Sequence, residues 1–182
     1  MGGVGCAEQQ NKGALTAAGL RHFLDSGLPT RGLEPSWLRS WRDEFESMLP
    51  GEATRALAKQ AMLFEEFLAG EADAGRLKLA LKPVAQKALL HGHCHQKSMG
   101  LLGPAKSLLA KLQGSTVVDL DAGCCGMAGS FGYSKEHYGV SRAIGERKLL
   151  PALRHRKAGS ALVAAGTSCR QQVETLPGAD RI

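Results

Sequence analysis

The 182-residue sequence has no apolar run of the about 18 or more residues that a transmembrane helix requires. Its first residues, Met1–Cys6, lack the charged n-region and the apolar h-region of a secretory signal peptide, so we expect none. The cysteine count is five, an odd number, and no Cys-x-x-Cys pair occurs. These absences argue against a disulfide framework and a common zinc ribbon, and they favour a cytoplasmic protein with reduced thiols.

Aromatic residues make up only 5% of the sequence, and no stretch interleaves them with basic residues. Nucleic acid is therefore not an expected partner, because single-strand binding depends on aromatic side chains within a basic groove. The net charge of +6 is spread along the chain, with its densest run at Arg154–Lys157. We interpret that run as the solvated end of a helix, with an acidic partner surface as the alternative.

Three short apolar segments bounded by turn residues predict buried strands at 87–93, 115–121 and 160–166. Helical patterns lie between them, over 104–112 and 136–154. Strands that alternate with helices are typical of a parallel sheet with right-handed crossovers. The sequence therefore predicts an α/β fold, a parallel sheet with flanking helices.

The first half of the chain is predicted to be a helical segment that serves as a scaffold. Helices are expected over 34–48 and 52–71, separated by a Pro-Gly pair, and a short strand at 29–33 precedes them. The second helix has a stripe of apolar residues at helical spacing, which indicates a core-facing side. The stripe consists of Leu57, Ala61, Phe64 and Leu68.

Four cysteines follow the ends of the three predicted strands. Cys94 follows the first strand, the adjacent Cys124 and Cys125 follow the second, and Cys169 follows the third. Because the carboxyl ends of parallel strands share one edge of a sheet, we expect the four thiols to converge there. Converging thiolates suit zinc or an iron–sulfur cluster, whereas separately buried thiols would leave this placement to chance.

The adjacent cysteines favour a cluster over a single ion. A disulfide between neighbours is strained, because bridged cysteines need Cα atoms about 4.4–6.8 Å apart and consecutive Cα atoms lie about 3.8 Å apart. Neighbouring side chains also diverge, so Cys124 and Cys125 would more readily bind different irons. The glycines Gly123, Gly126 and Gly129 let the backbone come close and offer N–H groups to the sulfurs.

Three histidines, His91, His93 and His95, alternate around Cys94. On a strand this alternation would place them on one face. One of them is a candidate ligand, proton relay or hydrogen-bond donor, although a capping or supporting role is favoured for each over direct ligation. A nucleophilic pair of Cys94 with a histidine, as in a thiol-dependent hydrolase or transferase, is the alternative. It leaves the other three cysteines unexplained.

The cysteine segments His91–Lys97, Cys124–Tyr138 and Gly166–Gln172 resemble the cysteine-rich CCG domain. That domain occurs in the cysteine-rich subunit of heterodisulfide reductase, in the iron–sulfur subunit of glycolate oxidase and in lactate-utilisation proteins. The likeness is strongest to the C-terminal part of FAD-linked oxidases of the D-lactate and D-2-hydroxyglutarate dehydrogenase type. It covers residues 29 to about 173.

The resemblance implies an iron–sulfur cluster of the 4Fe-4S type, held by Cys94, Cys124, Cys125 and Cys169, with His93 and His95 tuning the site or relaying protons. FAD would belong to a partner or a further domain, where it oxidises a 2-hydroxy acid such as D-lactate, glycolate or D-2-hydroxyglutarate.

The module would pass the electrons to a downstream acceptor, and no catalytic residue is assigned. It would work in the cytoplasm, or at the inner face of the membrane through a partner. The alternative is a zinc-binding or metal-free docking module for a flavoprotein.

Three positions depart from the family pattern. Gly166 stands where many CCG domains have the first cysteine of a Cys-x-x-Cys pair, and Trp37 stands where the preceding half-motif has a cysteine. Cys6 is interpreted as a bystander, at most a remnant of the first half. We therefore divide the chain into a helical segment with a remnant of a first CCG half, 1–80, and a CCG α/β domain, 81–182.

Overall fold

The computed structural model describes residues 3–84 and 86–175, without the side chains of residues 3–10, 12, 17 and 23. The chain divides into two compact units, residues 1–64 and 65–182, and each is described by itself. Residues 65–80 are thus grouped with the cysteine-bearing part of the chain. The functional division into a remnant half and a CCG domain stays a prediction.

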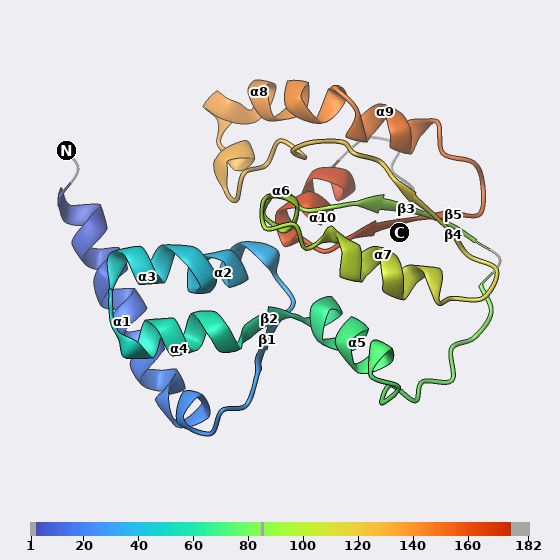
Figure 1. Cartoon of the computed structure of the whole chain (residues 1–182). Helices are drawn as coiled ribbons and strands as arrows, with labels where there is room; N and C mark the ends of the chain where they lie inside the picture. The colour runs from blue at the N-terminus through green and yellow to red at the C-terminus, as the bar shows by residue number, and fades with distance from the viewer. Residues whose placement is uncertain (1–2, 85, 176–182) are drawn as a thin grey trace. The chain divides into compact units, whose positions relative to one another are not determined.

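The first unit consists of helices and a small parallel sheet (Figure 1). At its second helix, the Glu34 carboxylate accepts a hydrogen bond from the backbone N–H of Ser36 at 3.4 Å, and Pro35 occupies the first turn. Both are helix-start signals. The elements are α1 (Gly3–Asp25), β1 (Thr30–Gly32), α2 (Pro35–Arg39), the π-helical turn η1 (Ser40–Glu44), α3 (Phe45–Met48), α4 (Glu52–Gln60) and β2 (Ala61–Leu63).

The predicted helix over 52–71 is wrong in its middle. Helix α4 ends at Gln60, β2 follows, and only then does α5 (Phe64–Asp73) begin. Strand β2 pairs in parallel with β1, which buries Ala61 and Leu63 and leaves Phe64 41% exposed. The apolar residues of this segment therefore alternate in and out as in a strand, and the expected helical stripe does not form.

The second unit contains a three-stranded parallel sheet in the order β4-β3-β5. Its strands are β3 (Lys87–His91), β4 (Thr116–Asp119) and β5 (Ser160–Ala164). In the register of the sheet, Leu89 of β3 lies opposite Val118 on one side and Leu162 on the other. The predicted α/β class with a parallel sheet is confirmed, and each strand lies within the segment that predicted it.

Helices flank this sheet, with α8 and α9 on one side and α7 on the other (Figure 1). The single helix predicted over 136–154 is wrong, because the chain breaks at Lys148 and a second helix begins. Pro151 explains the break, since proline has no N–H for a continuous helix but is tolerated in a first turn. The helices are α6 (Cys94–Ser98), α7 (Leu102–Ala110), the 3-10 turn η2 (Phe131–Tyr133), α8 (Lys135–Glu146), α9 (Leu149–Arg154) and α10 (Thr167–Glu174).

The core of the second unit runs from the sheet into the cysteines. Leucines of α9 pack with Leu89 and Leu162 of the sheet, and Cys125 and Cys169 belong to the same buried group. Burying each large apolar side chain contributes roughly 1.5–3 kcal/mol, so this core stabilises the positions of both thiols. The α9 leucines are Leu149, Leu150 and Leu153.

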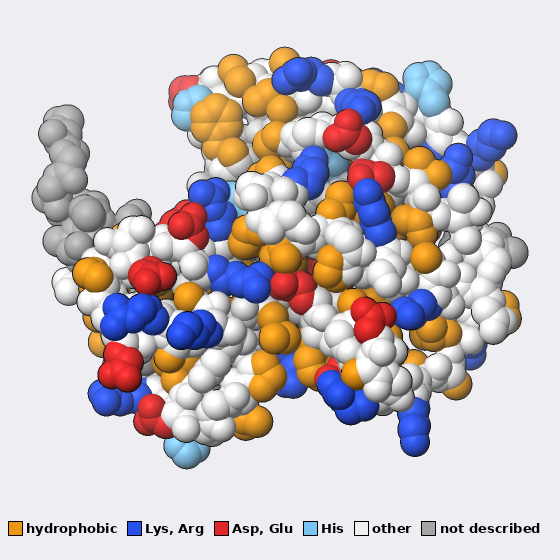
Figure 2. All heavy atoms as spheres, in the orientation of Figure 1, with side chains coloured by type: hydrophobic (Ala, Val, Ile, Leu, Met, Phe, Trp, Pro, Cys, Tyr) orange, Lys and Arg blue, Asp and Glu red, His pale blue; other side chains and the backbone are white. Residues whose placement is uncertain are grey.

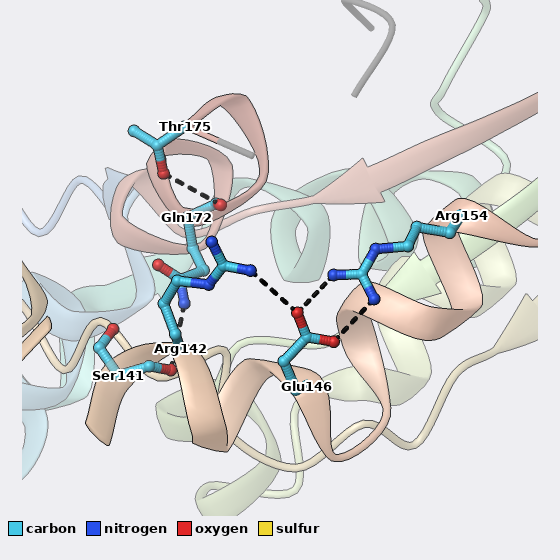
Figure 3. Close-up of polar contacts among 6 residues, drawn as sticks. All are labelled: Ser141, Arg142, Glu146, Arg154, Gln172 and Thr175. Carbon is cyan, nitrogen blue, oxygen red and sulfur yellow. Dashed lines mark hydrogen bonds and ion pairs between the residues drawn. The ribbon is translucent and has the colours of Figure 1, made fainter. Parts of the chain in front are cut away.

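The described helices include none with the length and apolar character needed to cross a bilayer. On the face shown in Figure 2, lysine and arginine side chains are interspersed with acidic and apolar ones. Arg154, which begins the densest basic run, forms hydrogen bonds with the Glu146 carboxylate, one of them at 2.8 Å, and Arg142 binds the same carboxylate at 3.1 Å (Figure 3). The pair of Arg154 with Glu146 joins α9 to α8, whereas the pair of Arg142 with Glu146 lies within α8.

Candidate metal centre

Parallel strands bring the predicted ligands to one edge of the sheet in the second unit. Cys94 is the first residue of α6, just beyond β3. Cys124 and Cys125 lie in the loop of residues 120–130 that follows β4, here called the cysteine loop. Cys169 lies in the first turn of α10, beyond β5. The connections that follow β3, β4 and β5 thus place all four thiols at the same edge of the sheet.

The structure brings these four thiols together. Hydrogen bonds join the sulfurs in the order Cys94, Cys124, Cys125, Cys169, and all four cysteines are free of disulfides. We call this group the cysteine cluster. The fifth cysteine, Cys6, lies on α1 with its side chain outside the described residues, so its interpretation as a bystander stays a prediction.

Hydrogen bonds within the cysteine cluster divide the sulfurs into acceptors, whose pKa is lowered, and donors, whose pKa is raised. The pKa of Cys124 is lowered because Cys125 and Cys94 donate S–H bonds to it. A hydrogen bond from Cys125 and the neighbouring imidazole of His91 lower the pKa of Cys169 to about 5. Donating such bonds, together with burial, raises the pKa of Cys94 and of Cys125. These hydrogen bonds favour the thiolate form of Cys124 and Cys169, and thiolates are the form that binds metals.

His91, the last residue of β3, lies against the buried end of the cysteine cluster. Its side chain is 1% exposed, and a ring nitrogen and the sulfurs of Cys125 and Cys169 all lie within 4.8 Å of one another. Among the described residues, no oxygen or nitrogen atom hydrogen-bonds to the ring nitrogens of His91, which have the Cys169 sulfur as a neighbour. Two sulfurs and an imidazole nitrogen form a donor set that suits zinc or iron.

The three histidines do not share one strand face as their alternation predicted, because β3 ends at His91 and α6 begins at Cys94. His93 is instead the N-cap of α6. Its Nδ1 accepts a hydrogen bond from the backbone N–H of His95 at 3.2 Å and lies 4.0 Å from the Cys94 sulfur. Its own backbone N–H donates to Gln96 Oε1 at 3.3 Å. The expected tuning or proton-relay role of His93 and His95 stays a prediction.

Neighbouring elements fix the start of α6 from two sides. The amide nitrogen of Gln96 donates to Glu65 Oε1 of α5 at 2.7 Å, and burial raises the pKa of that carboxyl. On the other side, a Cβ atom at Gly166 would lie 2.9 Å from His93 Nε2 and would collide with the rest of the ring. The imidazole therefore fills the space that a side chain at Gly166 would need.

The cysteine loop has an unusual backbone. Five of its residues have positive φ, and two of them are not glycine, which costs about 1–3 kcal/mol at each such position. The bend also directs the backbone N–H of Gly126 at the Cys124 sulfur, 3.3 Å away. The residues are Asp121 (φ 42°), Gly123 (φ 67°), Gly126 (φ 104°), Ala128 (φ 44°) and Gly129 (φ 69°).

Two lysines hold this strained backbone in place. Lys97 of α6 donates to the Gly123 carbonyl at 2.7 Å. Lys148, between α8 and α9, donates to the Asp121 carbonyl at 2.9 Å and to the carboxylate of the same residue at 3.3 Å. Each lysine binds the carbonyl of a residue with positive φ, so the two contacts offset part of the strain of the loop.

Helix α8 packs against the cysteine loop. The Ser141 carbonyl accepts a hydrogen bond from the buried Gln172 amide of α10 at 3.2 Å (Figure 3). A Cβ atom at Gly126 would collide with that carbonyl, and one at Gly145 would lie 3.0 Å from the Cys125 carbonyl oxygen. Two glycines thus let the backbone of the loop touch the helix and fix the position of Cys125.

Sequence reasoning located the thiols but gave less weight to the residues around them. The family resemblance implies a role at the site for His93 and His95 and none for His91, and only its place at the end of an apolar strand distinguishes His91. Lys97 follows Cys94 in the same motif and offered a weak signal. Lys148 and Gln172 offered none, because their partners are distant in sequence and are backbone carbonyls.

No protein-family model matches the sequence, and no solved structure is significantly similar to it. Among curated proteins, the chain is 31% identical over 150 residues to one subunit of the anaerobic glycerol-3-phosphate dehydrogenase of Escherichia coli K12, which covers 81% of this chain and 36% of that subunit. It is 29% identical over 178 residues to the D-2-hydroxyglutarate dehydrogenase of the same strain, covering 92% of this chain and 16% of that enzyme. The D-2-hydroxyglutarate dehydrogenase of Pseudomonas putida is 30% identical over 167 residues, covering 88% of this chain and 15% of that enzyme.

The chain therefore spans 36% of the length of the first relative and 16% of the second. The relatives are dehydrogenases or subunits of one, which supports an oxidoreductase-related role and fits a relation to FAD-linked oxidases. The matches cover 81% and 92% of this chain.

Proposed function

We propose that this chain is an iron–sulfur electron-transfer module of the CCG-domain type that serves an FAD-dependent 2-hydroxy-acid dehydrogenase. The observation that supports the proposal is the cysteine cluster, four free thiols from three connections of one parallel sheet with their sulfurs hydrogen-bonded in a row. Four thiolates match the ligand number of a 4Fe-4S cluster. Bound there, such a cluster would accept and release single electrons.

The cysteine cluster has a buried and a more accessible side. Cys125 and Cys169 are 4% and 1% exposed, whereas Cys94 and Cys124 are only partly buried. The buried side belongs to the hydrophobic core, which excludes water and fixes the two sulfurs. An electron-exchange partner would approach from the side of Cys94 and Cys124, because the path through protein is shorter there.

In this proposal the flavin and the substrate belong to a partner subunit or to a further domain. The named relatives differ in substrate, glycerol-3-phosphate for one and D-2-hydroxyglutarate for the other. We therefore expect the substrate to be chosen outside the shared segment. D-lactate, glycolate and D-2-hydroxyglutarate remain proposed substrates of the flavin partner, and the module would act in the cytoplasm or at the inner face of the membrane through that partner.

A zinc-binding docking module is the second candidate, and one observation favours it. A nitrogen of His91 and the sulfurs of Cys125 and Cys169 lie within 4.8 Å of one another, which suits a single tetrahedral ion completed by one more ligand. Such a module would hold the fold together and bind a flavoprotein without carrying electrons.

The metal content of anaerobically purified protein tests the proposal. We expect about four iron and four acid-labile sulfide per chain, with broad visible absorption that bleaches on reduction. Cys125→Ser should lose the iron and the absorption, because its sulfur lies between two others in the cluster. It should also destabilise the fold, since metal binding is coupled to folding.

Cys6→Ser is the matched control, because Cys6 is predicted to be a bystander, and we expect this variant to keep wild-type iron. Zinc without sulfide in the wild-type protein would favour the docking module. Full iron content in Cys125→Ser would show that this residue is not a ligand.

A further inference from the structure

His91 is buried in a way that an ordinary core histidine is not. Its side chain is 1% exposed, yet among the described residues no oxygen or nitrogen atom pairs with its ring nitrogens, which have the Cys169 sulfur as a neighbour. A buried polar group without a strong partner costs free energy, so a site of this kind normally serves a purpose. The neighbouring residues on β3, Leu89 and Leu90, are buried apolar side chains that offer no hydrogen bond.

The sulfurs near the His91 imidazole indicate a metal-binding role. A ring nitrogen of His91 and the sulfurs of Cys125 and Cys169 lie within 4.8 Å of one another, and all three residues are buried. This upper limit is compatible with ligands that close on a shared metal, since zinc–nitrogen bonds are about 2.0 Å and zinc–sulfur bonds about 2.3 Å. A metal bonded to the nitrogen would give it a strong partner that the protein alone does not provide.

The other two histidines near the cluster are arranged differently. His93 uses Nδ1 to cap α6, and its ring packs on Gly166. His95 lies within α6, and its ring meets that of His93 edge to face, with centroids 5.1 Å apart. His91, by contrast, is held by the last pairing of β3 with β5, opposite Ala164, so its direction is set by the sheet.

We propose that His91 is a direct ligand of the bound metal in place of one of the four thiolates, so that the protein supplies one nitrogen and three sulfurs and the centre is a mixed nitrogen–sulfur site. The inference rests on the proposed function only for the identity of the metal group. Replacing a thiolate ligand by neutral imidazole removes negative charge from a cluster and raises its reduction potential, as in clusters with two histidine ligands. The nitrogen would therefore make the centre easier to reduce.

Pulsed EPR of the reduced, cluster-loaded protein labelled with 15N-histidine tests the ligand directly. We expect a strong 15N coupling that disappears in His91→Cys and persists in His155→Gln, a control that removes an exposed histidine of the same unit. His91→Cys should still load iron, because thiolate replaces imidazole, and its reduction potential should be lower than that of the wild type. Wild-type protein without 15N coupling, or His91→Cys with an unchanged potential, would overturn the proposal.

X-ray absorption at the metal edge separates failure of this inference from failure of the proposed function. If the protein binds zinc and no sulfide, the iron–sulfur function fails, but one nitrogen at about 2.0 Å beside sulfurs at about 2.3 Å would still support His91. If iron and sulfide are complete but the metal sees sulfur alone, the function stands and the inference fails. A protein that takes up neither iron nor zinc on anaerobic reconstitution overturns both.

The stability of His91→Leu distinguishes a ligand from a structural histidine. In metal-free protein under a chelator, we expect this variant to melt at or above the wild-type temperature, because a buried imidazole without a strong partner is replaced by an apolar side chain. After metal loading the order should reverse, with affinity for zinc lower by at least about tenfold. Destabilisation of the metal-free variant by as much as the loaded one would contradict the proposal.

Discussion

The backbone carbonyl of Cys125 and helix α8 approach each other at Gly145, a contact that only a residue without a side chain permits. A Cβ atom at Gly145 would lie 3.0 Å from that carbonyl oxygen and 3.1 Å from the Gln172 amide. The second contact matters as well, because the amide donates a hydrogen bond to Ser141 on the same helix. One glycine therefore accommodates both a cysteine of the cluster and the link from α10.

Helix α8 offers a matched pair of substitutions to test this contact. Gly145→Ala should destabilise the protein by about 1–3 kcal/mol, because the added methyl displaces Cys125 or Gln172. Gly139→Ala lies on the same helix with no other atom near its Cβ position, so it should stabilise by about 0.5–1 kcal/mol through helix propensity alone. Urea unfolding of both variants measures the difference, and equal effects would show that the contact is not tight.

At the residue scale the sequence predicted that the four thiols converge, but it placed the three histidines incorrectly on one strand face. Cys94, Cys124 and Cys169 each follow a recognisable apolar strand, and the edge shared by parallel strands is a rule of topology. The role of His91 depends on the absence of any oxygen or nitrogen partner for its ring nitrogens among the described residues, and that is a property of packing. Spacing alone also predicted a strand face for His93, because it does not reveal where β3 ends.

Of the two helices that carry a proposed ligand, α6 is shorter than α10, and its neighbours compensate for its length. A helix of one turn and a half has few hydrogen bonds of its own, so its position depends on its N-terminal cap and on side chains from elsewhere. Glu65 of α5 binds the Gln96 side chain, which in turn binds the backbone of His93. Helix α5 thus supports the element that presents Cys94.

This support should depend on pH. Burial raises the pKa of Glu65 in the folded protein above its unfolded value, so the ionised form costs folding free energy as pH rises between the two values. Glu65→Gln keeps an acceptor for Gln96 without the charge. Its gain in the free energy of unfolding over wild type should be small at acidic pH and larger at neutral pH.

Urea unfolding at two pH values measures this gain, with Glu136→Gln, an exposed glutamate of α8, as the control for charge. A gain that does not grow with pH would show that burial does not raise the pKa of the Glu65 carboxyl.

Element boundaries were the least predictable part of the fold. The segment 61–63 has apolar residues at positions that fit both a helix and a strand, and its pairing with β1 decides in favour of the strand. The break at Lys148 is different, because Pro151 was a visible signal that the predicted helix ignored. The strand at 61–63 thus depends on pairing with a segment distant in the sequence, whereas the break before α9 could be predicted from Pro151 itself.

On the scale of the whole molecule, the proposed ligands all belong to the second unit, residues 65–182. The described part of the first unit contributes helices and a two-stranded sheet. Metal binding should therefore stabilise one unit directly, since a ligand that binds only the folded form adds its binding free energy to folding. The strained cysteine loop should depend on it most.

Removing the metal tests this expectation. We compare by calorimetry the metal-loaded protein with protein treated anaerobically with a chelator. Removing the metal should lower the unfolding temperature of the second unit and should change that of the first unit little. Hydrogen exchange should then increase at the cysteine loop and at α6 before it increases at α4. An equal loss of protection in α4 would mean that the two units unfold as one.

The order of the ligands along the chain has a consequence for synthesis in the cell. Cys94 leaves the ribosome well before Cys169, and at ~5–20 residues per second the delay is on the order of ten seconds. During that interval the first three thiols have no fourth partner, and β5, which pairs beside β3, has not yet been made. In the proposed site, metal insertion is therefore a step that follows translation of the sheet, and the newly made thiols need a reducing environment until it is complete.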